Sequence, residues 1–224
     1  PGAGDDRSIR VALVQTNLPQ DNKTVWTFRE QLDAFAHFVE MTRTWAARDP
    51  ETGNRPDLIV WPETMVPGLG LDDATLAEIA RFEAEGNAPV TGDVGISGLI
   101  YDASLTHLSQ DLGVPLLVGA TALEGPSIDV KDEMDDKGRP IQLIVPDYSA
   151  QYNSAFLYVP DAGRTSDRYD KIVLTPFGEI IPVVHRWPRI QNFVVRLGAK
   201  GMRFDLDRGT DASRLAIPIQ SAPL

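Results

Sequence analysis

The chain has 224 residues, of which 42% are hydrophobic and 24% charged, and this balance is ordinary for a globular protein that buries a core. Its net charge of −11 argues against nucleic acid as a partner, because phosphates would be repelled. No stretch approaches the ~20 continuous apolar residues that a membrane-spanning helix needs. No signal peptide is visible and the first residue is Pro1 rather than Met, so we expect a processed or excised piece.

The sequence contains no cysteine and three scattered histidines, His37, His107 and His185. The lack of cysteine removes disulfides, zinc-thiolate sites and cysteine nucleophiles from this sequence. The histidines are too few and too dispersed to favour a histidine-based triad or metal cluster. We therefore predict neither a metal nor a cofactor.

Short β-rich apolar runs predict strands, and apolar residues three and four positions apart predict helices. In the first helix, for example, Phe28, Leu32 and Phe35 follow one another at steps of four and three. The predicted elements, in chain order, are a strand at 9–17, a helix at 25–47, a strand at 57–63, helices at 72–86 and 101–112, and strands at 114–121, 152–159, 170–176 and 215–219.

The alternation of strands and helices in the first half is typical of an α/β fold, with a parallel or mixed sheet covered by helices. The later strands follow one another without helices between them. We therefore expect hairpin pairing at one side of the sheet. Since no repeat, low-complexity tract or linker is evident, we predict a single domain over residues 1–224.

Charge is unevenly spread along the chain. Residues 122–150 carry seven acids and three bases, whereas residues 164–214 carry ten bases and six acids. The run "DVKDEMDDK" at 129–137 is typical of a solvated surface insertion. A calcium-binding loop is the alternative, but the regular ligand spacing and the glycine of an EF-hand are missing.

Three polar residues stand at or near the ends of predicted strands: Glu63 closes "DLIVWPE", Lys171 begins or precedes "IVLTP", and Glu179 follows "TPFG". In α/β folds, function gathers at the carboxyl ends of strands. A carboxylate near a lysine in apolar surroundings can act as a general base, and the lysine can stabilise an oxyanion. The structural alternative is that Glu63 caps a helix and Lys171 forms an ion pair that only supports the fold.

Four stretches, "VALVQTNLPQDNKTVW", "DLIVWPET", "YNSAFLYV" and "YDKIVLTPFGEIIP", resemble the nitrilase (carbon-nitrogen hydrolase) superfamily. More narrowly, they look like the catalytic domain of the bacterial apolipoprotein N-acyltransferases. The motifs "WPET" and "YDK…L.PFGE.IP" are specific as a pair and occur in the correct order. The resemblance spans residues 9–185 with gaps, and it leaves 72–98 and 122–150 as long or divergent insertions.

The resemblance implies the αββα sandwich of the nitrilases, incomplete here at its C-terminus, and a Glu-Lys-Cys triad. By motif position, Glu63 would be the general base and Lys171 the oxyanion stabiliser. Glu179 would orient the lysine or support the intermediate. Trp26 would match the tryptophan that follows "PQ..K" in the family, as a substrate-binding residue.

The implied reaction transfers a fatty acyl chain from a phospholipid to the N-terminal amine of a diacylglyceryl lipoprotein, through a thioester. The phospholipid donor and the lipoprotein acceptor are therefore the expected partners. The implied location is the bacterial inner membrane, with the catalytic domain on its periplasmic side.

The missing cysteine is the main departure from the family, whose nucleophile follows the lysine by a few tens of residues. The chain ends at Leu224, 53 residues after Lys171, so we expect truncation before the nucleophile and an inactive fragment. Two alternatives are loss of the cysteine and its replacement by Ser221, although "QSAPL" does not resemble the family's Cys-aromatic-Glu.

The segment 185–203 carries five basic residues and no acid, and Ile190, Phe193 and Leu197 fall on one helical face. Such a helix suits a lipid interface. A helix packed on the sheet with an exposed basic face fits equally well.

Two further functions stay open beside the acyltransferase. One is a soluble nitrilase-type amidase that hydrolyses a small C–N bond. The other is a non-catalytic binding module that keeps the nitrilase fold. The motif "PFGE.IP" and the opening "Q.N.PQ" favour the acyltransferase.

Overall fold

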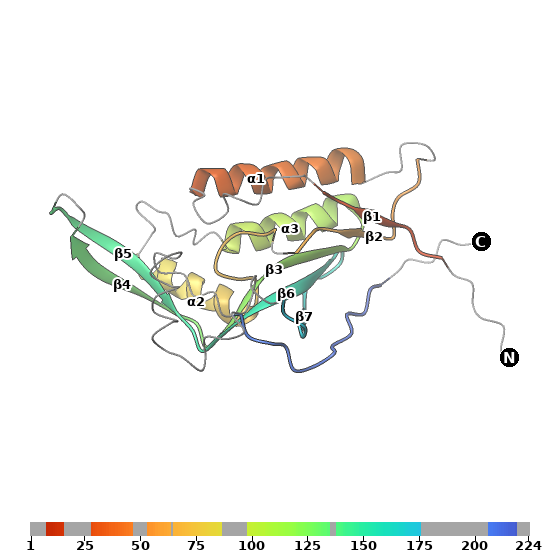
Figure 1. Ribbon diagram of the computed structural model, residues 1–224. Helices are drawn as coiled ribbons and strands as arrows, with labels where there is room; N and C mark the ends of the chain where they lie inside the picture. The colour runs from red at the N-terminus through yellow and green to blue at the C-terminus, as the bar shows by residue number, and fades with distance from the viewer. Residues whose placement is uncertain are drawn as a thin grey trace.

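The computed structural model describes residues 8–15, 28–46, 53–63, 65–86, 98–134, 138–175 and 206–218. Its elements, in chain order, are β1 (Val11–Leu13), α1 (Phe28–Met41), a π-helical turn (Thr42–Ala46), β2 (Leu58–Val60), α2 (Asp73–Ala84), α3 (Gly98–Leu112), β3 (Leu116–Glu124), β4 (Ser127–Met134), β5 (Pro140–Asp147), β6 (Ala150–Val159) and β7 (Gly163–Asp170). The predicted α/β class is confirmed (Figure 1).

Five strands form one mixed sheet in the order β1-β2-β3-β6-β7, and β4 pairs with β5 in a separate two-stranded sheet. The pairs β1–β2 and β2–β3 are parallel, whereas β3–β6 and β6–β7 are antiparallel. The parallel strands come from the helix-rich first half of the chain. Within the described residues, β6 and β7 follow one another without a helix between them and pair antiparallel, so the expected hairpin pairing at one side of the sheet is confirmed.

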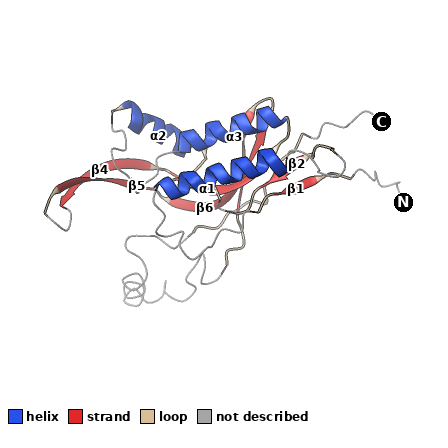
Figure 2. Cartoon of the chain, turned by 90° about the horizontal axis from the view of Figure 1, so that it is seen from above, coloured by secondary structure: helices blue, strands red, loops and turns tan. Residues whose placement is uncertain are grey.

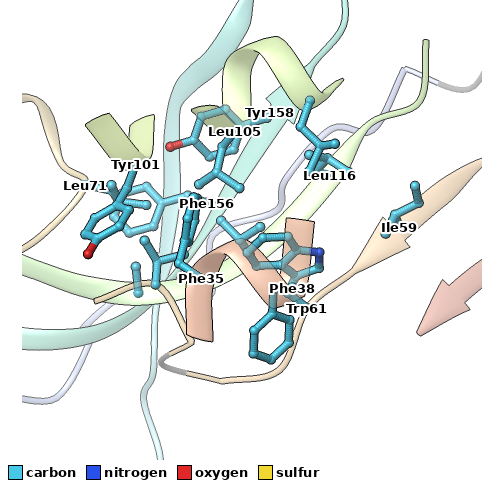
Figure 3. Close-up of a cluster of buried hydrophobic side chains, with 14 of the residues drawn as sticks. Phe35, Phe38, Ile59, Trp61, Leu71, Tyr101, Leu105, Leu116, Phe156 and Tyr158 are labelled. Atoms are coloured by element: carbon cyan, nitrogen blue, oxygen red, sulfur yellow. The ribbon is translucent and has the colours of Figure 1, made fainter. Parts of the chain in front are cut away.

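The helices α1 and α3 lie side by side on one face of the sheet (Figures 1 and 2). The core fills the space between them and the sheet, and alternate residues of β3, from Leu116 to Ala122, point into it. Aromatic side chains dominate this core: the ring centroids of Phe35 and Tyr101 are 4.7 Å apart (Figure 3). One helical layer and one sheet layer of the expected αββα sandwich are thus present within the described ranges.

Two predicted strands are wrong. In the run 170–176 only Asp170 belongs to a strand and residues 171–175 do not, because the strand lies earlier, at Gly163–Asp170. The sequence "GRTSDRYD" lacks the apolar pattern of a strand, but it pairs with the buried strand β6, as in Ala155↔Tyr169. Residues 215–218 also lie outside any strand.

The acidic segment 122–150 contains the end of β3 and the hairpin of β4 and β5, which projects from the body of the chain (Figures 1 and 2). In β4 only Ile128 is buried, and residues 129–134 are exposed, as expected for a solvated run. The strands β4 and β5 were not predicted, because this acidic segment was interpreted as a solvated insertion. The status of 72–98 and 122–150 as insertions stays a prediction.

A partly buried polar network ties α3 to β6 and β7. The hydroxyl of Tyr158 donates to Asp102 Oδ1 at 2.7 Å, and Nε of Arg164 donates to the same oxygen at 2.9 Å. Burial, reinforced by the negative charge of Asp102, raises the pKa of the Tyr158 hydroxyl well above its ordinary value. The network anchors β7 at the end opposite to Lys171.

Asp72 caps α2 and joins that helix to the sheet. Its carboxylate accepts hydrogen bonds from the backbone N–H of Thr75 at 2.9 Å and from the N–H of Leu123 at 2.9 Å. It also accepts the hydroxyl of Thr75 at 2.7 Å, and only 5% of the residue is exposed. The cap therefore satisfies a helix donor and a strand donor together.

We predict that Asp72→Ala lowers the free energy of unfolding by about 3 kcal/mol, because it removes a cap and leaves buried N–H donors unsatisfied. Asp73→Ala is the matched control, since the Asp73 side chain is 74% exposed and forms a surface ion pair worth less than about 1 kcal/mol. Urea unfolding measures both variants. Equal losses would contradict the structural role given to Asp72.

Candidate active site

Glu63 and Lys171, predicted as a functional pair, lie in direct contact. Nζ of Lys171 donates to Oε1 of Glu63 at 2.6 Å, across 108 residues of sequence. Glu63 stands three residues after β2, and Lys171 directly follows β7. The Lys171 side chain is 26% exposed and that of Glu63 is 55% exposed, so the ion pair is accessible from solvent.

The chain that carries Glu63 is held by Trp61, which is 3% exposed. The backbone N–H of Trp61 donates to the carbonyl of Leu117 at 2.9 Å, and its indole Nε1 donates to the Thr42 hydroxyl at 2.9 Å. The Trp61 ring also packs on Phe38, with centroids 5.0 Å apart (Figure 3). Backbone and side chain are thus both fixed two residues before Glu63.

Thr42 belongs to the π-helical turn that ends α1, and it is completely buried. Its hydroxyl donates to the carbonyl of Phe38 at 2.8 Å while it accepts from Trp61. Such π-helical turns occur frequently at functional sites. Here the turn presents an acceptor to the tryptophan that precedes Glu63.

Asn153, on β6, is a site residue that the sequence analysis missed. Its side-chain Nδ2 donates to the same Oε1 of Glu63 that accepts from Lys171. Its backbone carbonyl accepts the N–H of Lys171 at 2.8 Å. Asn153 is 8% exposed. An amide inside the largely apolar run "YNSAFLYV" is the sequence signal that could have identified it, because a buried polar side chain needs a hydrogen-bond partner.

Asp170, the acidic neighbour of Lys171, faces the other side of the sheet. It accepts the Ser154 hydroxyl at 2.5 Å and forms an ion pair with Arg168 at 3.0 Å. Successive strand residues point to opposite faces, which separates Asp170 from the side chain of Lys171. Glu63, far away in sequence, thus provides the carboxylate that Lys171 contacts.

A pocket of about 440 Å³ surrounds the pair. Glu63, Asn153 and Lys171 contribute polar groups to it, and most of its remaining lining is apolar. The apolar side chains of the lining include Val60, Leu117, Ala155 and Val173. A carboxylate and an ammonium in such surroundings provide a proton acceptor beside a positive charge for a developing oxyanion.

The other predicted site residues, Glu179 and Trp26, lie outside the described residues, as do Ser221 and the segment 185–203. Within the described ranges, no group of three or more His, Cys, Asp or Glu side chains is arranged to hold a metal ion. In the same part of the chain, no helix has both the length and the apolar character needed to cross a membrane.

No protein-family model matches the chain. It is similar to curated apolipoprotein N-acyltransferases: 28% identical over 219 residues to that of Allorhizobium ampelinum, covering 96% of this chain and 30% of the relative. The enzyme of Methylococcus capsulatus is 29% identical over 81% of this chain and 24% of its own length. That of Agrobacterium fabrum is 30% identical over 78% of this chain and 24% of its own length. The chain therefore spans under a third of the length of these relatives.

Solved structures with some likeness include an amidase from Nesterenkonia sp., with a TM-score of 0.38 and 16% identity over 75% of this chain and 44% of that one. A carbon-nitrogen hydrolase from Helicobacter pylori has a TM-score of 0.37 and 14% identity over 76% of this chain and 41% of that one.

We predict that Asn153 and Glu63 are energetically coupled. Because a buried amide donates to a charged carboxylate, a double-mutant cycle of Asn153→Ala and Glu63→Ala should give a coupling energy of about 1 kcal/mol or more in urea unfolding. As a control, Asn153→Ala and Asp111→Ala should add within about 0.5 kcal/mol, since Asp111 pairs with Arg43 elsewhere in the chain. Additivity of the first pair would contradict the contact.

Proposed function

Since this chain is a relative of the apolipoprotein N-acyltransferases, we propose that it is the catalytic region of such an enzyme. The parent protein transfers a fatty acyl chain from a phospholipid to the N-terminal amine of a diacylglyceryl lipoprotein. The observation that carries the proposal is the 2.6 Å contact between Lys171 Nζ and Glu63 Oε1 inside a largely apolar pocket. Such a lining suits an acyl chain, and the ion pair suits the reacting ester carbonyl.

In the first half-reaction, Glu63 removes the proton of a cysteine thiol, and the thiolate attacks the ester carbonyl of the phospholipid. Lys171 stabilises the negative oxygen of the tetrahedral intermediate. The C–O bond of the ester then breaks, and the leaving lysophospholipid oxygen takes the proton from Glu63. A thioester between enzyme and acyl chain remains.

In the second half-reaction, the N-terminal amine of the lipoprotein attacks the thioester carbonyl. Glu63 accepts the amine proton and the C–S bond breaks as the amide forms. The leaving thiolate then takes that proton from Glu63, which regenerates the thiol. Glu179 orients Lys171 or supports the intermediate, and Trp26 contacts substrate. Because the two half-reactions share a covalent intermediate, the proposal implies ping-pong kinetics.

The nucleophilic cysteine has to come from outside these 224 residues, which contain none. The chain by itself is therefore inactive. The parent enzyme acts on the periplasmic side of the bacterial inner membrane, and residues 185–203 form its lipid-facing contact. The catalytic region is one domain over 1–224, with 72–98 and 122–150 as insertions.

We predict that Glu63→Gln and Lys171→Met each reduce acyl transfer in the parent enzyme by roughly 10³-fold, since the first removes the proton acceptor and the second the oxyanion-stabilising charge. Glu179→Gln should also reduce transfer, because it removes the carboxylate that orients Lys171 or supports the intermediate. The assay follows a labelled acyl chain from phospholipid to a diacylglyceryl peptide. Asp73→Asn serves as a control for a charge change outside the pocket. Retention of transfer by either the Glu63 or the Lys171 variant would exclude the proposed triad. Hydrolysis of small amides without any acyl transfer would instead identify a soluble amidase.

The absence of cysteine favours a second candidate, a non-catalytic binding module. The sequence of the parent gene beyond the codon for Leu224 separates the two. We predict a Cys-aromatic-Glu motif soon after that codon, followed by an apolar span of ~20 residues. If a stop codon follows the codon for Leu224 with no cysteine codon between them, the acyltransferase proposal would be rejected in favour of the binding module.

A further inference from the structure

The segment 206–210 contacts the sheet beside Lys171, although it is distant from Lys171 in sequence and forms no strand. Figure 1 shows it in blue, on the side of the sheet away from α1 and α3. The backbone N–H of Asp207 donates to the carbonyl of Gln151 at 2.7 Å. In return, the N–H of Gln151 donates to the Asp207 carboxylate at 2.9 Å. This reciprocal pair fixes the segment to the beginning of β6.

Two residues further on, the segment holds the backbone of Lys171 itself. The N–H of Gly209 donates to the carbonyl of Lys171 at 3.0 Å. On the other side, the N–H of Lys171 donates to the carbonyl of Asn153 at 2.8 Å. Both polar backbone groups of Lys171 are thus engaged, one by β6 and the other by the segment 206–210.

Gly209 is buried, and its lack of a side chain permits this approach. A Cβ atom at Gly209 would overlap the carbonyl oxygen of Asp170, and it would lie 2.8 Å from the carbonyl carbon and 2.9 Å from Cβ of that residue. The first two of these atoms belong to the backbone, so no side-chain rotation relieves the overlap. Any larger residue at 209 must push the segment away from Asp170 and Lys171.

We propose that residues 207–209 are a positioning clamp that sets the ammonium of Lys171 against Glu63. The inference rests on the proposed function, in which Lys171 stabilises an oxyanion. Lys171 follows the last strand residue, Asp170, so β7 itself gives it no further support on its C-terminal side. Electrostatic stabilisation depends on placing the charge within a fraction of an ångström, and the clamp provides that placement.

The test uses the 224-residue chain with ¹⁵N-labelled lysine and reads the Nζ resonance of Lys171, assigned with Lys171→Arg. In the unsubstituted chain, Glu63→Gln should shift this resonance, because it removes the charge of the contacted carboxylate. When Gly209→Ala is already present, Glu63→Gln should shift the Lys171 Nζ resonance much less, because the ammonium is no longer held against Glu63. Exchange of the Lys171 backbone N–H with solvent should also become roughly tenfold faster.

Gly163→Ala is the matched control, because it strains β7 at its opposite end, where Gly163 has φ +74° and packs on Thr106. It should lower stability but preserve the response of Lys171 to Glu63→Gln. If the Gly209→Ala variant does not fold, Asp207→Ala tests the clamp instead. It is a milder change, because it removes only the carboxylate that accepts the N–H of Gln151. Its control is Asp211→Ala. This change removes an exposed carboxylate that accepts a hydrogen bond from the hydroxyl of the neighbouring Thr210.

The outcomes separate the clamp from the proposed function. A full response of Lys171 to Glu63→Gln in both Gly209→Ala and Asp207→Ala would overturn the clamp and leave the proposed function standing. No response in the unsubstituted chain would overturn both, because the Glu63–Lys171 pair would be absent. Loss of the response in Gly209→Ala or Asp207→Ala, with the controls unaffected, supports the clamp.

Discussion

The antiparallel pairing of β3 with β6 is the interaction on which the candidate site depends. It runs from Leu116↔Tyr158 to Glu124↔Ala150 and joins the parallel part of the sheet to its antiparallel part. Glu63 belongs to the parallel part, because it follows β2, the neighbour of β3. Lys171 belongs to the antiparallel part, because it follows β7, the neighbour of β6. Their separation in space is therefore set by the register of β3 against β6.

Two carboxylates show how differently this fold uses negative charge. Asp72 is 5% exposed and accepts three hydrogen bonds, so its role in stability follows from burial and complete pairing. The Glu63 side chain is 55% exposed and receives Lys171 and Asn153 at one oxygen, which concentrates two donors on a single atom in a pocket. Partly exposed ion pairs contribute little to stability. The arrangement around Glu63 therefore fits a catalytic role better than a role in stabilising the fold.

Much of the fold was predictable from residue spacing, and the failures have clear physical causes. The predicted helices at 25–47, 72–86 and 101–112 correspond to α1, α2 and α3, because each has a buried face with helical spacing. The strand β7 was missed, since "GRTSDRYD" is polar and owes its conformation to pairing with β6. The apolar run "IVLTP" was misassigned for the opposite reason. It reads as a strand, yet Val173 is 80% exposed and contributes to the pocket lining.

The sequence by itself determined the α/β class, the strands β2, β3 and β6, and the identity of Glu63 and Lys171 as candidates, because hydrophobic period and motif spacing are local properties of the chain. Only the tertiary structure decided that Glu63, rather than the adjacent Asp170, contacts Lys171. It alone revealed Asn153 and Gly209 as neighbours of that lysine. These contacts join residues tens of positions apart, and they arise from strand register and close backbone approach. Neither leaves a periodic pattern in the sequence, because register depends on how two distant segments pair.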